Sequence, residues 1–224
     1  MRVRALHETL ETASQKGQLP FKFFAITDRD SDVQSVPTKS VNIFSWDVYH
    51  IENYFLEPKF IAKVLSALQV GNSLTEEVIW DELRQSAQDS LPQLIRHELS
   101  EYANQKLISS INTGTDPKAA NLSGVLFEAA SRSVERVRAV YEADLSAEAL
   151  GKKEAEARGR YLESIANGTW VSTVRGRDIL KKFAGKHAPL VSYEVFRNLI
   201  ISQMKDADYK PAGMAEVVKQ ILTT

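Results

Sequence analysis

Two carboxylates follow an apolar run near the start of the chain. Phe23-Phe24-Ala25-Ile26 is followed, after one threonine, by Asp28-Arg29-Asp30. Aspartates one residue apart can both reach Mg²⁺ or Mn²⁺, because hard divalent cations take oxygen ligands. Such a cation polarises a phosphodiester and stabilises the leaving oxygen, while a carboxylate accepts a proton from the attacking water. Asp28 and Asp30 are therefore candidate metal ligands, although aspartate is also common where a strand simply ends in a turn.

Two strands are expected to position these acids. The runs 21–26 and 41–44 are short, rich in aromatic and β-branched residues, and bounded by polar segments, which predicts buried strands. Ligands of open α/β sheets bind outside the carboxyl ends of parallel strands. An aspartate pair at the end of the first strand would lie at that edge.

The stretch after the second strand carries a family resemblance. It reads His50-Ile51-Glu52-Asn53-Tyr54-Phe55-Leu56-Glu57-Pro58. A strand ending in DRD, a second strand and then HIENYFLEP resembles the Toprim-like domain of OLD-type (overcoming lysogenisation defect) ATPase-nucleases. The similarity is greatest to Toprim-like effectors that accompany, or are fused to, ABC-type ATPases in phage defence. The resemblance implies that Asp28, Asp30 and Glu52 bind Mg²⁺ or Mn²⁺, with Glu52 a ligand or an orienting catalytic carboxylate.

A second motif lies near the C-terminus. The related domains often carry a Gly-Lys pair before a leucine-rich helix, and this chain has Gly176-Arg177 before Ile179-Leu180. A cation in the first turn of a helix near a metal can hold a phosphate or stabilise developing charge. The resemblance implies this catalytic role for Arg177. An exposed basic residue without a function is the alternative, and arginine offers a different geometry from lysine.

One part of the family pattern is missing. Toprim-type sheets open with a strand that ends in a glutamate, the usual general base. Here residues 6–16 predict a helix that ends at Gly17, and no such strand precedes Leu6. We therefore expect an incomplete site with reduced catalysis in this chain, completed by a longer form of the protein or by a partner chain.

The rest of the chain predicts helices. Helical patterns are found in residues 58–68, in a segment from 75, in a new helix from Pro92 onwards, and in 122–141, 143–166, 193–204 and 211–222. Residues 112–121 are typical of a loop, and residues 170–174 predict a short edge strand. The KKEAEARGR stretch predicts a solvated helix face with ion pairs. The expected fold is α/β, with a reduced Toprim-like parallel sheet flanked by helices and a large helical insertion or extension. Its parts are a partial core at 6–57, a helical region at 58–168 and a C-terminal segment at 169–224 that returns to the core.

Composition narrows the class of protein. The 224 residues include no cysteine, which excludes disulfides and thiolate metal sites and fits the cytoplasm. No apolar stretch predicts a membrane helix. The net charge of −1 gives no overall basic field, although a local basic surface can exist. The chain has no P-loop, so any ATP hydrolysis would come from a partner.

Three functions remain open at this point. The first is a nuclease effector that acts on DNA or RNA together with an ABC-type ATPase. The second is a non-catalytic Toprim-like remnant or regulatory subunit that binds that ATPase. The third is a small metal-dependent phosphohydrolase. Asp32, Asp47 and His50 are weaker site candidates, and each also fits a loop or a helix cap.

Overall fold

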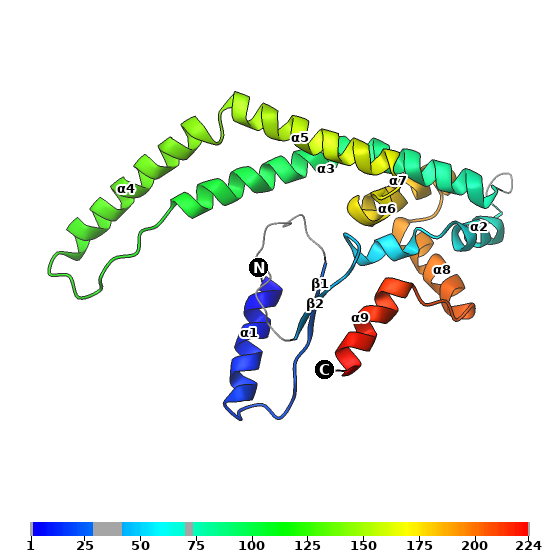
Figure 1. The fold of residues 1–224 in the computed structure, drawn as a ribbon, viewed down its shortest axis with the longest axis horizontal. Helices are drawn as coiled ribbons and strands as arrows, with labels where there is room; N and C mark the ends of the chain where they lie inside the picture. The colour runs from blue at the N-terminus through cyan, green and yellow to red at the C-terminus, as the bar shows by residue number, and fades with distance from the viewer. Residues whose placement is uncertain (1, 29–41, 70–73, 224) are drawn as a thin grey trace. The chain divides into compact units, whose positions relative to one another are not determined.

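The computed structural model describes residues 2–28, 42–69 and 74–223. Most of these residues are helical, and a small parallel sheet accompanies the helices (Figure 1). In chain order the elements are α1 (Arg2–Gln15), β1 (Ala25–Thr27), β2 (Ile43–Ser45), the 3₁₀ helix η1 (Ile51–Phe55), α2 (Pro58–Ala67), α3 (Glu76–Ser110), α4 (Leu122–Ala143), α5 (Ala147–Ala166), α6 (Trp170–Thr173), α7 (Gly176–His187), α8 (Tyr193–Asp206) and α9 (Ala212–Thr223).

The chain forms two compact units. The first contains Met1–Ser90 and Ser164–Thr224, and the second contains Leu91–Glu163. The boundary falls inside α3, close to Pro92. The expected helix start at Pro92 is wrong, because α3 continues through it. Proline removes one backbone hydrogen bond and crowds the preceding turn, but the helix is held by burial on both sides of it, since Leu91 and Leu94 are 4% and 2% exposed.

The two expected strands pair in parallel. Ala25 lies opposite Ile43, and Thr27 opposite Ser45. Each strand is only three residues long, and only Ala25 among them is fully buried, so the prediction of longer, buried strands is wrong. The apolar run begins before the strand does, since Phe21 precedes β1 and is 66% exposed. The apolar run therefore includes the residues that lead into the strand as well as the strand itself.

Helices cover this small sheet. Helix α1 lies along β1, and α9 lies against β2 (Figure 1). Gly17 ends α1 at a φ of +70°, as its C-cap role predicts. The buried His7 ring holds α1 to the chain before β1 through a 3.0 Å hydrogen bond between Nε2 and the Phe23 carbonyl.

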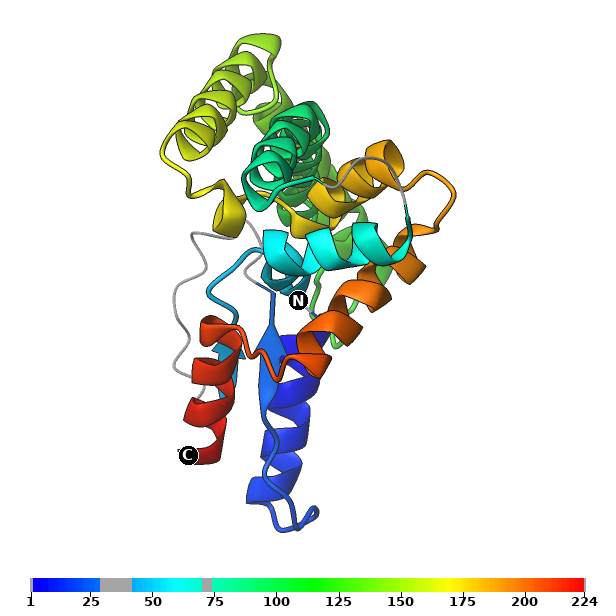
Figure 2. The ribbon, with the colours of Figure 1, turned by 90° about the vertical axis from the view of Figure 1, so that its right-hand side faces the viewer.

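The core of the first unit is helical. Helix α2 lies beside α8, as Figure 2 shows, and α7 packs on both α8 and η1. Pro58 occupies the first turn of α2, as expected. The largest fully buried side chains are Trp170, Phe60, Phe183, Phe196, Ile61, Ile79 and Leu83.

The expected strand at 170–174 is wrong. Residues 170–173 form the helical turn α6, because the amides of Ser172 and Val174 donate to the Thr169 and Trp170 carbonyls. These amides are therefore not available for hydrogen bonds to a neighbouring strand. Trp170 is fully buried and its ring lies 5.1 Å from that of Trp80 on α3. β-branched residues here support a buried turn rather than a strand.

The second unit consists of the distal part of α3, α4 and α5. The prediction of an exposed, ion-paired face on α5 is confirmed, with Arg158 bonded to Glu154 at 3.0 Å. Arg160 donates to both carboxylate oxygens of Glu98, at 2.7 and 2.8 Å. One face of α4 is exposed although it is apolar: Phe127 is 74% exposed. Among the described residues, no helix has both the length and the apolar character needed to cross a bilayer.

Candidate functional site

The predicted site residues lie at different places in the first unit. Asp28 follows β1 directly and is exposed. Asp30, its predicted partner, and Asp32 lie outside the described residues. Glu52 lies on η1 and is half-buried, and Arg177 lies exposed in the first turn of α7. The positions of Asp28 at a strand end and Arg177 in a first helical turn are those expected from the sequence.

Asn53 joins the two motif stretches. Its side chain is 3% exposed and makes four hydrogen bonds. Oδ1 accepts from the backbone N–H groups of His50 at 2.9 Å and Gly176 at 3.1 Å. Nδ2 donates to the carbonyls of Val171 and Val174, each at 2.7 Å. A buried amide whose donors and acceptor are all used holds η1 against the start of α7.

Gly176 is required at this junction. A Cβ on Gly176 would lie 2.5 Å from the backbone nitrogen of Asn53 and 2.7 Å from its Cα. Only a residue without a side chain allows η1 and α7 to approach so closely. The glycine of the Gly-Arg pair therefore has a packing role, and it places Arg177 next to η1.

Tyr54 and Asp47 have structural roles beside the site. The Tyr54 hydroxyl donates to Asp47 Oδ1, and its ring meets that of Trp46 edge-on at 5.9 Å. Burial raises the pKa of Tyr54, and the bond to Asp47 adds to this effect. The Asp47 carboxylate also lies against Gly213 in the first turn of α9. Asp47 is an exposed acid in the loop between β2 and η1, as the sequence predicts, and its carboxylate contacts the start of α9.

Glu52 differs from its neighbours because the fold does not use its side chain. Among the described residues it makes no hydrogen bond and no ion pair, although it is half-buried. Its charge acts on Tyr193 at the start of α8. A half-buried carboxylate without a structural partner is a candidate for chemistry.

Tyr193 is the point where the two motif stretches meet α8. The Arg177 guanidinium lies 5.9 Å from the centre of the Tyr193 ring, Lys181 Nζ lies at 5.5 Å, and the Arg197 guanidinium at 5.8 Å. We call Arg177, Lys181, Arg197 and Tyr193 the Tyr193 cluster. Glu52 and Arg177 are thus brought to one place, whereas Asp28 lies at the end of β1, outside this cluster.

Burial and charge set the state of Tyr193. Burial and then the negative charge of Glu52 raise the pKa of Tyr193 to about 12, against the opposing effect of Arg197 and Arg177. The hydroxyl is therefore neutral and able to donate a hydrogen bond at neutral pH. It is buried, and no group among the described residues accepts its proton.

The candidate ligands are of the type that a hard cation takes. Asp28 and Glu52 supply carboxylate oxygens, and Mg²⁺ is often held by one or two carboxylates together with substrate phosphates. Within residues 2–28, 42–69 and 74–223 no group of three metal-ligating side chains is gathered. The cation chemistry would consist of polarising the phosphate and stabilising the leaving oxygen.

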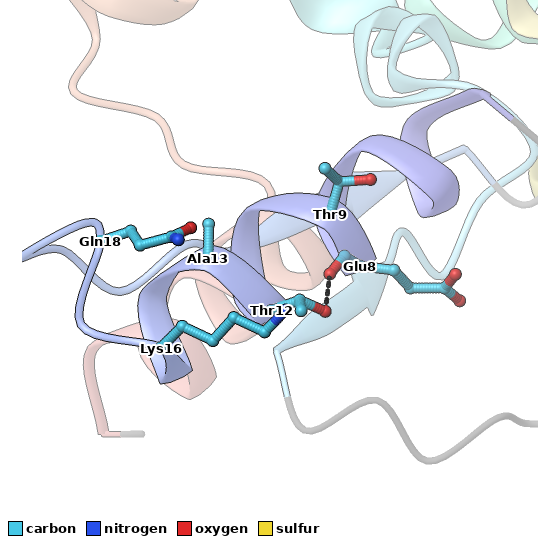
Figure 3. A pocket seen from close by; sticks show the side chains of 6 residues that line it. All are labelled: Glu8, Thr9, Thr12, Ala13, Lys16 and Gln18. Carbon is cyan, nitrogen blue, oxygen red and sulfur yellow. Dashed lines mark hydrogen bonds between the residues drawn. The ribbon is translucent and has the colours of Figure 1, made fainter.

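A surface hollow lies elsewhere in the same unit. Figure 3 shows it along α1, lined by Glu8, Thr9, Thr12, Ala13, Lys16 and Gln18. Thr12 Oγ1 donates to the Glu8 carbonyl at 2.8 Å within the helix. Of the described candidates, Asp28, Glu52 and Arg177 do not line this hollow, so we do not assign the function to it.

Sequence analysis missed three members of the Tyr193 cluster. Lys181 lies four residues after Arg177 on α7, and Arg197 lies four residues after Tyr193 on α8. Residues four apart share a helix face, so this spacing was the available signal. The pairing of the two helices was not visible in the sequence.

Comparison of the chain with protein-family models, with curated proteins and with solved structures finds no match in any of the three.

Proposed function

We propose that this chain is a Toprim-like, divalent-metal-dependent nuclease that hydrolyses phosphodiester bonds of DNA or RNA. The observation that carries the proposal is the hydrogen bond between Gly176 and Asn53, residues 123 positions apart. It joins the two stretches that resemble Toprim-like effectors, HIENYFLEP and the Gly-Arg pair before a leucine-containing helix. Glu52 and Arg177 both act on Tyr193, and Asp28 directly follows the first strand of the parallel sheet.

Each residue has a distinct role in this proposal. Asp28 and Glu52, with Asp30, hold Mg²⁺ or Mn²⁺ through their carboxylates. Glu52 also orients the attacking water. Arg177 neutralises charge on the phosphate as the bond to the leaving oxygen breaks.

The proposal is tested first by metal binding. Calorimetric titration of Mn²⁺ into the wild-type chain, Asp28→Asn and Glu52→Gln should show binding that each substitution weakens at least tenfold. Glu194→Gln removes an exposed acid in the first turn of α8 and serves as the control, with unchanged binding. Equal binding by all four proteins would contradict the metal assignment.

Cleavage tests the reaction. Labelled single- and double-stranded DNA and RNA are incubated with Mn²⁺ or Mg²⁺. Because the site in this chain is expected to be incomplete, we expect slow cleavage, which EDTA, Asp28→Asn and Glu52→Gln abolish. Metal binding without cleavage of any polynucleotide would contradict the nuclease proposal and favour a non-catalytic binding subunit.

The resemblance extends the proposal to a partner, an ABC-type ATPase that supplies the nucleotide hydrolysis. Its test is co-expression of the chain with an ABC-type ATPase from the same source genome, followed by affinity purification. Recovery of a stoichiometric complex is expected, and two separately eluting proteins would contradict this partner.

A further inference from the structure

Three cations surround one tyrosine in the Tyr193 cluster. Arg177 and Lys181 come from α7, and Arg197 comes from α8, with distances of 5.9, 5.5 and 5.8 Å to the ring centre. No two of these charges can therefore be more than about 12 Å apart, so the three cations form one compact positive patch. Like charges this close repel each other unless an anion lies between them.

The described part of the chain supplies no anion at ion-pair distance from these cations. Among the described residues no carboxylate lies within such a distance of Arg177, Lys181 or Arg197, and Glu52 acts on Tyr193 without forming an ion pair. Many other cations of the chain are paired. Examples are Arg160 with Glu98, Lys106 with Asp144, Arg158 with Glu154 and Lys186 with Glu82.

The tyrosine adds an unused donor. The Tyr193 hydroxyl is buried, and among the described residues no group accepts its proton, although Arg197 lies close enough to donate to its oxygen. A buried hydroxyl that lacks a partner costs stability unless a ligand supplies one. The hydroxyl and the cations together offer the hydrogen bonds and charge that a phosphate oxygen accepts.

We propose that Lys181, Arg197 and the Tyr193 hydroxyl, together with Arg177, bind consecutive phosphates of a single nucleic-acid strand. The inference rests on the proposed nuclease function and specifies how its substrate is held. Phosphate contacts position a strand without reading its sequence. The cluster therefore fixes the backbone next to Glu52, and DNA and RNA strands of equal length bind equally.

Binding is measured without metal, so that it does not depend on cleavage. Fluorescence anisotropy of labelled single-stranded DNA and RNA is recorded in EDTA over a series of salt concentrations. Lys181→Gln and Arg197→Gln should each weaken binding at least threefold. Each should also reduce the slope of log affinity against log salt by about 0.7, the value for one phosphate contact on a single strand.

The chain offers a matched control. Lys182 is an exposed neighbour of Lys181 on α7, and Lys182→Gln removes the same charge outside the cluster. It should leave affinity and salt slope unchanged.

If Lys181→Gln and Arg197→Gln bind within twofold of the wild type, or if Lys182→Gln weakens binding equally, the proposal is wrong. Competition by inorganic phosphate at the same phosphate concentration as the oligonucleotide would also overturn it, because the site would then take free phosphate.

Tyr193→Phe provides an independent variant. It keeps the ring and removes only the hydroxyl, so strand affinity should fall two- to fivefold while the melting temperature is unchanged or higher. Unchanged affinity would remove the hydroxyl from the proposal. Strand binding that depends on the cluster but is not followed by cleavage would support this inference and contradict the proposed reaction, so the two can fail separately.

Discussion

The side chain of Asn53 and the backbone of Gly176 lie in direct contact, joined by a 3.1 Å hydrogen bond and by a spacing that leaves no room for a Cβ. This contact brings the start of α7 against η1. It explains two residues of the sequence motifs, the asparagine and the glycine, by packing. Glu52 and Arg177, which flank them, are left for chemistry.

Asn53→Ala should reduce the free energy of unfolding by about 3 kcal/mol. It removes four hydrogen bonds and leaves buried backbone groups without partners, and a typical bond contributes about 1 kcal/mol. Urea denaturation measures the change. Asn104→Ala, an exposed position on α3, is the control and should differ from the wild type by less than about 0.5 kcal/mol. Equal stability of both variants would show that the junction does not hold η1.

Gly176→Ala tests the close approach from the other side. A Cβ would meet backbone atoms of Asn53, which cannot move aside as a flexible side chain can, and we expect a loss of about 2 kcal/mol. Gly185→Ala lies on the same helix with open space around it and should instead stabilise the protein by about 0.5 kcal/mol. Thermal melts should show a lower melting temperature for Gly176→Ala and a higher one for Gly185→Ala than for the wild type. A higher melting temperature for Gly176→Ala would contradict the close packing.

A similar contact fixes α9. A Cβ on Gly213 would lie 2.1 Å from Oδ1 of Asp47, so Gly213→Ala should displace the carboxylate and cost about 1–2 kcal/mol. Asp47→Asn keeps an acceptor for Tyr54 but removes the charge at the start of the helix, a loss of about 0.3–1 kcal/mol. Chemical denaturation ranks the two variants. A smaller loss of stability in Gly213→Ala than in Asp47→Asn would contradict the close contact between Gly213 and Asp47.

Part of this arrangement was predictable from sequence. Apolar periodicity and capping predicted α1, α2, α4, α8 and α9, because their patterns are local. The parallel strand pair and the position of Arg177 in a first helical turn were also expected. Three expectations failed. Burial of Leu91 and Leu94 holds the helix through Pro92, and burial of Trp170 favours a turn, whereas part of the apolar run before β1 is exposed. Pro92 remains inside a helix, the segment at Trp170 turns instead of extending, and the strands are shorter than their apolar runs.

The candidate site was predictable only in part. Glu52 and Arg177 were identified from a resemblance, but the sequence does not reveal that the charges of both act on Tyr193. That arrangement depends on Asn53 bonding across 123 positions to Gly176. Lys181 and Arg197 become site candidates only once α7 and α8 are packed together. The assignment of Asp30 as a metal ligand stays a prediction, because Asp30 lies outside the described residues.

Glu52→Gln should lower the pKa of Tyr193 from about 12 towards its ordinary value of 10.0, because the negative charge that opposes ionisation is removed. Ultraviolet absorbance of the phenolate follows the titration, and subtracting the curve of Tyr193→Phe isolates this residue. Glu194→Gln, which lies next to Tyr193 in sequence but is exposed, is the control. A Tyr193 titration that is the same in the wild type and Glu52→Gln would place the carboxylate away from the cluster.

Alkaline pH should weaken the fold through Tyr209. Its hydroxyl donates to Glu57 Oε1 at 2.7 Å, and burial followed by this bond raises the pKa of Tyr209 from 10.0 to about 12. Because the pKa in the folded state is the higher one, the stability contributed by the neutral phenol is fully present below pH 10 and is lost as pH rises through about 12.

Tyr209→Phe should be less stable than the wild type at pH 8, since it lacks the hydrogen bond, and should lose less stability between pH 10 and 12. Tyr141→Phe, at a position that is 65% exposed, should follow the wild type at each pH. Denaturant melts across this range measure all three proteins, and parallel curves for the wild type and Tyr209→Phe would contradict the role of Tyr209, because the hydroxyl would then ionise equally in the folded and unfolded chains.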